Sequence, residues 1–243
     1  MLERLLKNSE PYRIGDNYRG TNIVFTAVID DQTYVVKIPR TIGPLINAYY
    51  TLQDKLFKGT RKLSFGKQML QREAKSLEKL AGLHSPKLIE YNNDVLVREY
   101  LDGDDFKKLD SDSQRKKALE AGFLGMMDIH DKGVVIGDAN VKNLLLNGDK
   151  PYWLDFDGVF DESNLAKSKA IDLLKFVYST YSTTRDEDVT LYSAELASKN
   201  MRQGVRENVK ELINPGLSSA RLWLPTRIPL DGVLNKKIKK ALS

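Results

Sequence analysis

The sequence predicts an α+β fold with a strand-rich first part and a mainly helical second part. Two β-branched runs around an acidic turn, and a further pair of strands before residue 102, predict the first part. Apolar residues at helical spacing predict most of the second part. The polar stretch Asp102-Gly103-Asp104-Asp105 separates the two patterns, so we expect two units, residues 1–101 and residues 102–243.

The acidic turn is Asp30-Asp31, and the runs on either side of it, residues 18–29 and 33–38, predict a β-hairpin. Pro39 is expected to end the second strand, because proline cannot extend a ladder of hydrogen bonds. Gly20 precedes the main body of the hairpin. A loop over phosphate groups is one interpretation of that position, although a loop with so few glycines is a weak signal.

A helix is predicted over residues 67–81, with Gly82 as its stop signal. Glu73 lies on the apolar face of this helix. A carboxylate directed to the interior needs a cationic partner, because burying it alone costs several kcal/mol. Lys37, in the middle of a hairpin strand, is the natural partner. The alternative is that Glu73 lies at the edge of the helix with its carboxylate in water.

The remaining predicted elements alternate short strands with longer helices. Strands are expected at residues 88–91, 95–101, 134–136, 144–146 and 152–154. Helices are expected from Ser111 or Ser113 to His130, over residues 165–178, and within residues 189–213.

Polar side chains lie at the ends of the last three short strands. Asp138 and Asn143 fall between two of them, and Asp155 follows the third. Carboxylate and amide oxygens are the ligands that Mg²⁺ prefers in proteins, so the stretch predicts a magnesium and phosphate site. In an extended chain Asp157 points to the same side as Asp155. It either supports the metal or caps the following turn, and we favour the turn because aspartate is a common turn residue.

The composition is ordinary for a globular protein and excludes several kinds of site. The 243 residues contain no cysteine, which excludes disulfides and thiolate metal sites. His84 and His130 are the only histidines, which argues against a multi-histidine zinc site. No secretory signal and no run of roughly 20 apolar residues is found, so we expect a cytoplasmic protein without a transmembrane segment.

The order of these polar residues resembles the protein-kinase-like superfamily. Tyr34-Val35-Val36-Lys37 is similar to the strand motif Val-Ala-Ile-Lys, and Arg72-Glu73-Ala74 is similar to the helix that supplies the paired acid. Ile136-Gly137-Asp138 stands where His-Arg-Asp is found in that family. The resemblance covers about residues 15–180. It implies a two-lobed kinase-like fold, with a small β-rich N-lobe, a reduced helical C-lobe, and the use of ATP and Mg²⁺.

The resemblance also implies a role for individual residues. Lys37 would bind the ATP phosphates with Glu73 holding its ammonium, and Asp138 would orient and deprotonate the acceptor hydroxyl. Asn143 and Asp155 would bind the metal. The other implied roles are contact with the nucleotide for Glu99, Tyr100, Leu101 and Gly20, and structural support of the catalytic loop for Asp172.

Departures from the common kinases point to the small atypical ones. No Ala-Pro-Glu follows Asp155, and Asp172 comes only 17 positions later, which leaves no room for an ordinary activation segment. The chain resembles both the Bud32 and RIO kinases and the bacterial lipopolysaccharide core kinases. Asp155-Phe156-Asp157 is similar to the Kdo kinases and the basic insert before Glu73 to the heptose kinases, whereas the segment at residues 169–173 is similar to Bud32.

Three functions therefore stay open. The first is phosphorylation of a sugar hydroxyl of a lipopolysaccharide-core-like acceptor. The second is a serine/threonine protein kinase or ATPase within an RNA-linked complex, and the third is a pseudokinase that serves as a binding module. The basic segment Lys236-Lys237-Ile238-Lys239-Lys240 is expected either to contact an anionic membrane or RNA, or, as we favour, to be a solvated helix end. Nothing in residues 181–243 indicates a further role.

Overall fold

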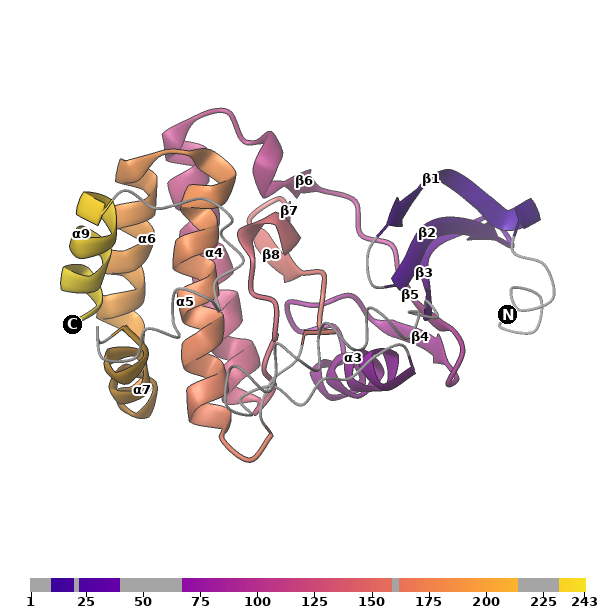
Figure 1. Cartoon of the computed structure of the whole chain (residues 1–243). Coiled ribbons are helices and arrows are strands. Elements are labelled where there is room, and N and C mark those ends of the chain that lie inside the picture. Colours follow the sequence, from indigo (N-terminus) through magenta and orange to yellow (C-terminus); the bar gives the residue numbers. More distant parts are fainter. Residues whose placement is uncertain (1–9, 20–21, 40–66, 159–161, 214–231) are drawn as a thin grey trace.

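The computed structural model describes residues 10–19, 22–39, 67–158, 162–213 and 232–243. A strand-rich part and a helical part lie side by side (Figure 1), which confirms the predicted α+β class. No helix among these residues is both long and apolar enough to cross a membrane.

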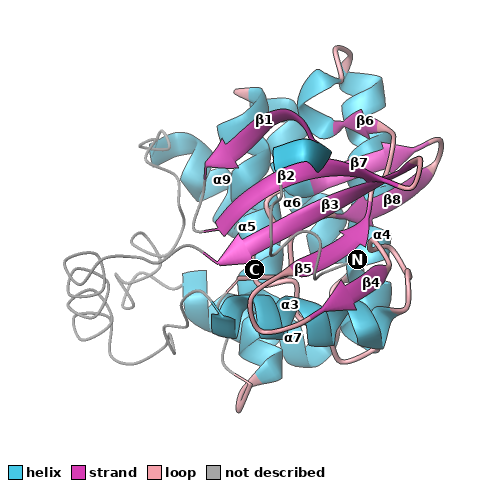
Figure 2. Ribbon diagram, turned by 90° about the vertical axis from the view of Figure 1, so that its right-hand side faces the viewer, coloured by secondary structure: helices cyan, strands magenta, loops and turns pink. Residues whose placement is uncertain are grey.

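The first part is built on a five-stranded antiparallel sheet, seen in Figure 2 with its strands side by side. In spatial order the strands are β1 (Arg13–Arg19), β2 (Asn22–Ile29), β3 (Gln32–Pro39), β5 (Leu96–Glu99) and β4 (Leu88–Tyr91). The β2–β3 hairpin is confirmed. Its turn residues Asp30 and Asp31 have φ angles of 50° and 63°, the positive values that a two-residue hairpin turn requires.

One detail of this sheet differs from the prediction. Residues 18–29 are not one strand, since the chain reverses between β1 and β2 and the two strands pair with each other. Pro39 is the last residue of β3, as predicted, and lies opposite Asn22 at the end of the ladder. Proline has no N–H to donate to a ladder of hydrogen bonds, so it is better tolerated at the last pair of a ladder than within it.

Helix α3 (Lys67–Leu80) packs against β3 and β4. It ends just before Ala81 and Gly82, whose φ angles of 49° and 86° break the helix as the glycine predicts. The helix buries Leu70 and Leu77 in the same apolar core as the C-terminal helices. A smaller cluster of buried apolar side chains, which includes Phe25, is formed by residues of the five-stranded sheet and of the turn before β5. Helix α3 therefore connects the sheet to the helical part.

The second part contains a three-stranded sheet and five helices among the described residues. The strands are β6 (Asp104–Asp105), β7 (Leu144–Asn147) and β8 (Lys150–Trp153). The helices are α4 (Asp112–Asp131), α5 (Leu165–Thr184), α6 (Glu187–Asn200), α7 (Gln203–Ile213) and α9 (Gly232–Leu242). Ser111 begins α4 with a capping box completed by Gln114. Helix α5 continues past residue 178 and ends at the left-handed Arg185.

Residues 134–136 are buried but do not form the expected strand. The backbone amide of Ile136, the last residue of this segment, donates to the side chain of Asp172 on α5. The amide of the next residue, Gly137, donates to the same side chain. A carboxylate thus takes the place of a neighbouring strand as hydrogen-bond acceptor. The β-branched residues fit this buried segment as well as they would fit a strand.

Candidate active site

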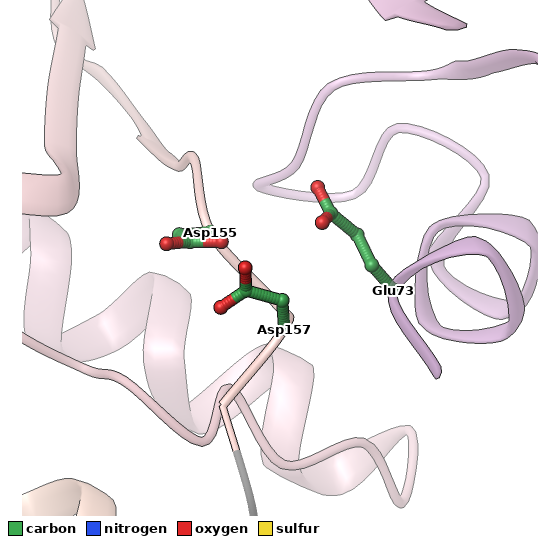
Figure 3. Close-up of side chains that lie close together, drawn as sticks. All are labelled: Glu73, Asp155 and Asp157. Carbon is green, nitrogen blue, oxygen red and sulfur yellow. The ribbon is translucent and has the colours of Figure 1, made fainter. Parts of the chain in front are cut away.

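The side chain of Lys37 is the centre of a buried ionic cluster. Its Nζ lies 2.7 Å from Glu73 Oε2 and 2.8 Å from Asp155 Oδ1. Strand β3 supplies the lysine, α3 the glutamate, and the segment after β8 the aspartate. Figure 3 shows Glu73 facing the two acids of that segment, Asp155 and Asp157. The contact between Lys37 and Glu73 that the sequence predicts is present, and Glu73 is fully buried.

The position of Lys37 follows from the register of the sheet. It lies opposite Val24 on one side and Leu96 on the other, so β3 is held between two strands at this point. Pairing on both sides fixes the backbone of Lys37, and the ion pairs with Glu73 and Asp155 hold its ammonium. The sheet therefore presents a preorganised cation at one place.

Arg98 on β5 is a second buried cation that the sequence reasoning missed. Its Nε lies 3.9 Å from Glu73 Oε1, and burial lowers the pKa of its guanidinium. The signal was a charged residue inside a short apolar strand, Leu96-Val97-Arg98. That signal is weak, because an alternating strand places such a residue on a solvent face just as readily.

The cluster changes the proton affinity of each acid. Burial raises the pKa of Glu73. Burial alone would also raise the pKa of Asp155, but the Lys37 ammonium holds it below its ordinary value. Burial, together with the neighbouring Asp155 carboxylate, raises the pKa of Asp157 to about 8. Burial acts to lower the pKa of Lys37, yet Asp155 and Glu73 keep it above its ordinary value. Two crowded aspartates thus share a site that has too little positive charge for both.

This donor set fits a hard divalent cation. Oxygen atoms of Glu73, Asp155 and Asp157 all lie within 4.8 Å of one another. Carboxylate oxygens are ligands of Mg²⁺, and a second positive charge relieves the repulsion between the two aspartates. Lys37 contacts both Glu73 and Asp155. Asp155 and Asp157 belong to one segment, and a metal held between them would offset the repulsion of their carboxylates.

Asp157 faces this cluster, a position that favours support of the metal over capping of the following turn. Its Oδ2 accepts a hydrogen bond of 3.0 Å from Asn22 Nδ2 on β2. The hydrogen bond joins the N-terminal sheet to the segment that carries Asp155. Asp157 therefore belongs to the site as the structure describes it.

Asp138 and Asn143 lie together in the loop before β7. Asn143 Nδ2 donates to the backbone oxygen of Asp138 at 3.0 Å and to its Oδ2 at 3.2 Å. The amide of Leu154 donates to the backbone oxygen of Asn143, which sets this loop beside the segment leading to Asp155. The side-chain oxygen of Asn143 is the atom of that amide suited to a cation.

The catalytic loop and the Asp155 segment touch through two glycines. Gly137 has a φ of +81°, and a Cβ atom there would come within 2.7 Å of the backbone oxygen of Gly158. A left-handed conformation and a close backbone approach both require glycine. This contact fixes the spacing between the Asp138 loop and the Asp155 segment.

Asp172 on α5 contacts the segment that leads to Asp138. Its carboxylate accepts hydrogen bonds from the amides of Ile136 and Gly137 at 2.8 and 2.9 Å. It also contacts His130 Nε2 at 3.1 Å. The loop has Ile136 where a histidine was expected, and His130 at the end of α4 brings an imidazole to the same acid. The sequence reasoning gave His130 no role.

Lys175, one helical turn beyond Asp172, is another residue that was missed. Its Nζ donates to the backbone oxygen of Gly137 and lies 3.5 Å from Asp138 Oδ1. Ser179, a further turn along, accepts from the amide of Val141 at 3.0 Å. The readable signal was the spacing of three polar residues on one face of α5.

Three of the predicted nucleotide contacts, Glu99, Tyr100 and Leu101, lie at and just after the end of β5, an inner strand of the five-stranded sheet. The amide of Glu99 donates to the Lys87 backbone oxygen, and Glu99 Oε2 accepts from the Lys87 amide. A base in contact with this segment would therefore use other backbone groups. Tyr100 is exposed and Leu101 partly exposed in the connection towards β6. Gly20 lies outside the described residues.

Comparison with known proteins places the chain among kinase-like folds. The RIO-domain family model matches residues 23–175. The KEOPS complex subunit Bud32 of Pyrococcus abyssi is 27% identical over 175 residues, which are 67% of this chain and 79% of that protein.

Two solved structures share the overall fold. WaaP in complex with acyl carrier protein aligns with a TM-score of 0.53 and 14% identity, covering 100% of this chain and 97% of that one. The Rio2 kinase–ADP/Mg²⁺–phosphoaspartate complex of Chaetomium thermophilum aligns with a TM-score of 0.54 and 14% identity, covering 99% and 73%. At such identities the likeness is one of fold alone. It confirms the kinase-like fold expected from the sequence.

Proposed function

This chain belongs to the RIO-domain family of atypical kinases, and from that membership we propose that it transfers the γ-phosphoryl group of ATP to a hydroxyl with the help of Mg²⁺. The observation that carries the proposal is the position of Lys37 Nζ, within 2.8 Å of both Glu73 and Asp155. A phosphate-binding lysine held by one acid and adjacent to a metal-binding acid is what phosphoryl transfer needs.

The residues of the cluster have separate tasks. Lys37 binds the α- and β-phosphates, and Glu73 holds its ammonium in place. Asp155 and Asn143 hold the metal, with Asp157 alongside. A bound Mg²⁺ supplies neutralisation of the negative charge on the phosphate oxygens. The backbone around Glu99, Tyr100 and Leu101 contacts the base. Gly20, which lies outside the described residues, stays a candidate for contact with the phosphates.

Asp138 orients the acceptor hydroxyl and takes its proton. Its carboxylate is 27% exposed, so an acceptor can reach it. A general base has to lie within hydrogen-bond reach of the proton that it removes, and transfer by such a group contributes roughly 10²–10⁴-fold to the rate. Asp172 keeps the loop in place through its hydrogen bonds to two backbone amides.

We place a protein acceptor first. The likeness to the KEOPS subunit Bud32 lies in the sequence and covers two thirds of this chain. A protein hydroxyl, or ATP hydrolysis within a multi-subunit assembly that handles RNA, is consistent with that likeness. The segment at residues 169–173, which is similar to Bud32, lies on α5 beside the catalytic loop.

A sugar hydroxyl of a lipopolysaccharide core is the second candidate. It is favoured by the Asp155-Phe156-Asp157 motif and by the shared fold with WaaP. The basic face of α9 would suit such an acceptor at an anionic membrane, since Lys236, Lys237 and Lys240 are exposed. Its apolar residues, including Ile238, are buried against the core, so this contact would be electrostatic.

We also propose that the two lobes meet at residues 102–105. Strand β5, the last of the five-stranded sheet, ends at Glu99, and β6 already belongs to the second sheet. The connection between them is short and partly exposed.

The first experiment is nucleotide binding. Thermal unfolding is measured with ATP, with and without Mg²⁺, for the wild type and for Asp155→Asn and Asp138→Asn. We expect Mg²⁺-dependent stabilisation of the wild type, its loss in Asp155→Asn, and its retention in Asp138→Asn. The absence of any Mg²⁺-dependent stabilisation of the wild type would contradict the proposed function.

The second experiment identifies the acceptor. Radiolabelled ATP is incubated with the protein alone, with a generic protein substrate, with lipopolysaccharide core, and with purified KEOPS partner subunits. Label in protein, or phosphate release that rises with the partner subunits, supports the first acceptor, and label in the glycolipid supports the second. Asp138→Asn is the control in each arm and is expected to remove the signal.

A further inference from the structure

We propose that Lys175 is a positioning residue for Asp138, an inference that rests on the proposed function. Lys175 comes from α5, and its side chain is only 13% exposed. Its ammonium donates to the backbone oxygen of Gly137 and lies 3.5 Å from Asp138 Oδ1. One cation therefore contacts both the loop backbone and the carboxylate that follows it.

Three residues on one face of α5 hold the catalytic loop. Asp172 accepts from the amides before Asp138, and Ser179 accepts from the amide of Val141 after it. Lys175 lies between these two contacts along the helix and is the member of the three for which a contact with the Asp138 side chain is found. Asp172 and Ser179 fix the path of the backbone, whereas Lys175 acts on the reacting group.

The Asp138 carboxylate meets a different partner at each oxygen. Asn143 Nδ2 donates to Oδ2 at 3.2 Å, and the Lys175 ammonium lies 3.5 Å from Oδ1. The terminal torsion of an aspartate is soft, with broad minima, so two partners on opposite oxygens narrow its range. Each oxygen keeps a second lone pair for the proton of an acceptor.

A cation at this place also has an electrostatic consequence. The loop after Asp138 does not supply that cation from Asn140, which is uncharged. The Asn140 side chain accepts from the Lys142 amide and caps the short turn of residues 141–143. The exposed Lys142 side chain lies on the solvent side of that turn. The positive charge found beside Asp138 thus comes from α5 and not from the loop itself. It offsets the negative charge of Asp138 where an anionic γ-phosphate has to approach.

The alternative is that Lys175 has a structural role only, as the hydrogen-bond donor to the Gly137 backbone oxygen. A purely structural tie would change stability and leave the chemical step unaffected at temperatures where the protein is folded. A positioning role would change kcat while leaving the KM for ATP in place, because Lys175 contacts Asp138 and not the Lys37 cluster.

The test measures phosphate release from MgATP by the full-length protein, with water as the acceptor. We expect Lys175→Met to lower kcat by about 10- to 100-fold, part of the contribution of a general base, with the KM for ATP unchanged within about twofold. Lys175→Arg is expected to restore most of kcat. Lys167→Met is the matched control, since Lys167 lies on the same helix and pairs with Glu211, and it should leave kcat unchanged.

The dependence on Asp138 is tested with a double mutant. In an Asp138→Asn background, Lys175→Met should cause no further loss of kcat, because the residue acts through Asp138. A further loss of the same size as in the wild type, an unchanged kcat in Lys175→Met, or a failure of Lys175→Arg to rescue would each overturn the inference.

A readout without turnover separates this inference from the proposed function. If ATP with Mg²⁺ does not stabilise the wild type against unfolding, the proposed function fails on its own, whereas a wild type that releases no phosphate to water only removes the kinetic readout. The contact is then measured by urea unfolding of the wild type, Lys175→Met, Asp138→Asn and the double mutant. Non-additive midpoint shifts of Lys175→Met and Asp138→Asn support the contact, and additive shifts overturn it. Should Lys175→Met not fold, Lys175→Gln replaces it in both assays.

Discussion

Lys37 Nζ is shared between two carboxylates, Glu73 Oε2 at 2.7 Å and Asp155 Oδ1 at 2.8 Å. The two acids come from α3 and from the segment after β8, so one ammonium joins the N-terminal sheet, its helix and the catalytic part. The same contacts therefore determine both stability and the geometry of the proposed phosphate site.

The first prediction concerns the stability of this cluster. Lys37→Met should lower the free energy of unfolding by about 3 kcal/mol, because it leaves Glu73 fully buried without its main partner. This value is at the low end of the cost of breaking a buried ion pair, because Arg98, 3.9 Å from Glu73, still offsets part of its charge. Urea denaturation measures the effect. In the Lys37→Met/Glu73→Gln double mutant much of the loss should be recovered, and an equal loss in both variants would contradict the ion-pair explanation.

The order of the site residues was readable from the sequence because each lies on a strongly patterned element. Lys37 sits in a β-branched strand and Glu73 on an amphipathic helix, so their types and order limited how they meet. Their contact is present at 2.7 Å. Asp155 was predicted to lie near Asn143 from the strands between them, and the backbone bond from Leu154 to Asn143 makes that proximity.

What the sequence left out depends on partners distant along the chain. Residues 134–136 looked like a strand because β-branched residues suit any buried extended segment. Their hydrogen-bond acceptor is a single carboxylate 36 positions after Ile136, which no local pattern reveals. Arg98 was missed for a similar reason, since the partner that makes its burial tolerable, Glu73, comes from another element. Lys175 was readable in principle, three positions after Asp172 on one helix face.

The second prediction decides between the two roles of Asp157. If it supports the metal, Asp157→Asn should raise the Mg²⁺ concentration for half-maximal ATP binding by roughly 10- to 100-fold, with a small change in thermal stability. Titration of Mg²⁺ against fluorescent ATP measures this. Asn22→Ala, which removes only the hydrogen bond to Asp157 Oδ2, should cause a smaller change in the same direction. A loss of stability with an unchanged Mg²⁺ requirement would assign Asp157 to the turn.

The third prediction compares Gly148 and Gly137, which both have a positive φ but differ in how closely other atoms surround them. Gly148→Ala, at φ +58° with nothing within 4 Å of the new Cβ, should cost about 1–2 kcal/mol from backbone strain alone. Gly137→Ala adds a clash with Gly158 and should cost clearly more, with a loss of turnover in whatever protein folds. Chemical denaturation gives both values. Equal losses would show that the contact between the two loops has no energetic weight.

The fourth prediction is a pH dependence at the hydrogen bond between Tyr178 on α5 and Asn235 on α9. Burial raises the pKa of Tyr178 to about 12, and its hydroxyl donates to Asn235 Oδ1 at 2.9 Å. Between pH 10 and pH 12 the unfolded chain loses this proton while the folded protein keeps it, so stability falls as the pH rises. At about 1.4 kcal/mol per pKa unit, this amounts to roughly 2–3 kcal/mol, fully present below pH 10.

Tyr178→Phe isolates the contribution of Tyr178 to the pH dependence of stability, because the lysines and the remaining tyrosines are the same in the two proteins. Near pH 8 the wild type should be more stable by about 1 kcal/mol, the net value of the hydrogen bond. As the pH approaches 12 the order should reverse, since phenylalanine has no proton to lose. Urea denaturation at several pH values measures the difference. A constant difference from pH 8 to pH 12 would mean that burial does not keep the Tyr178 hydroxyl protonated.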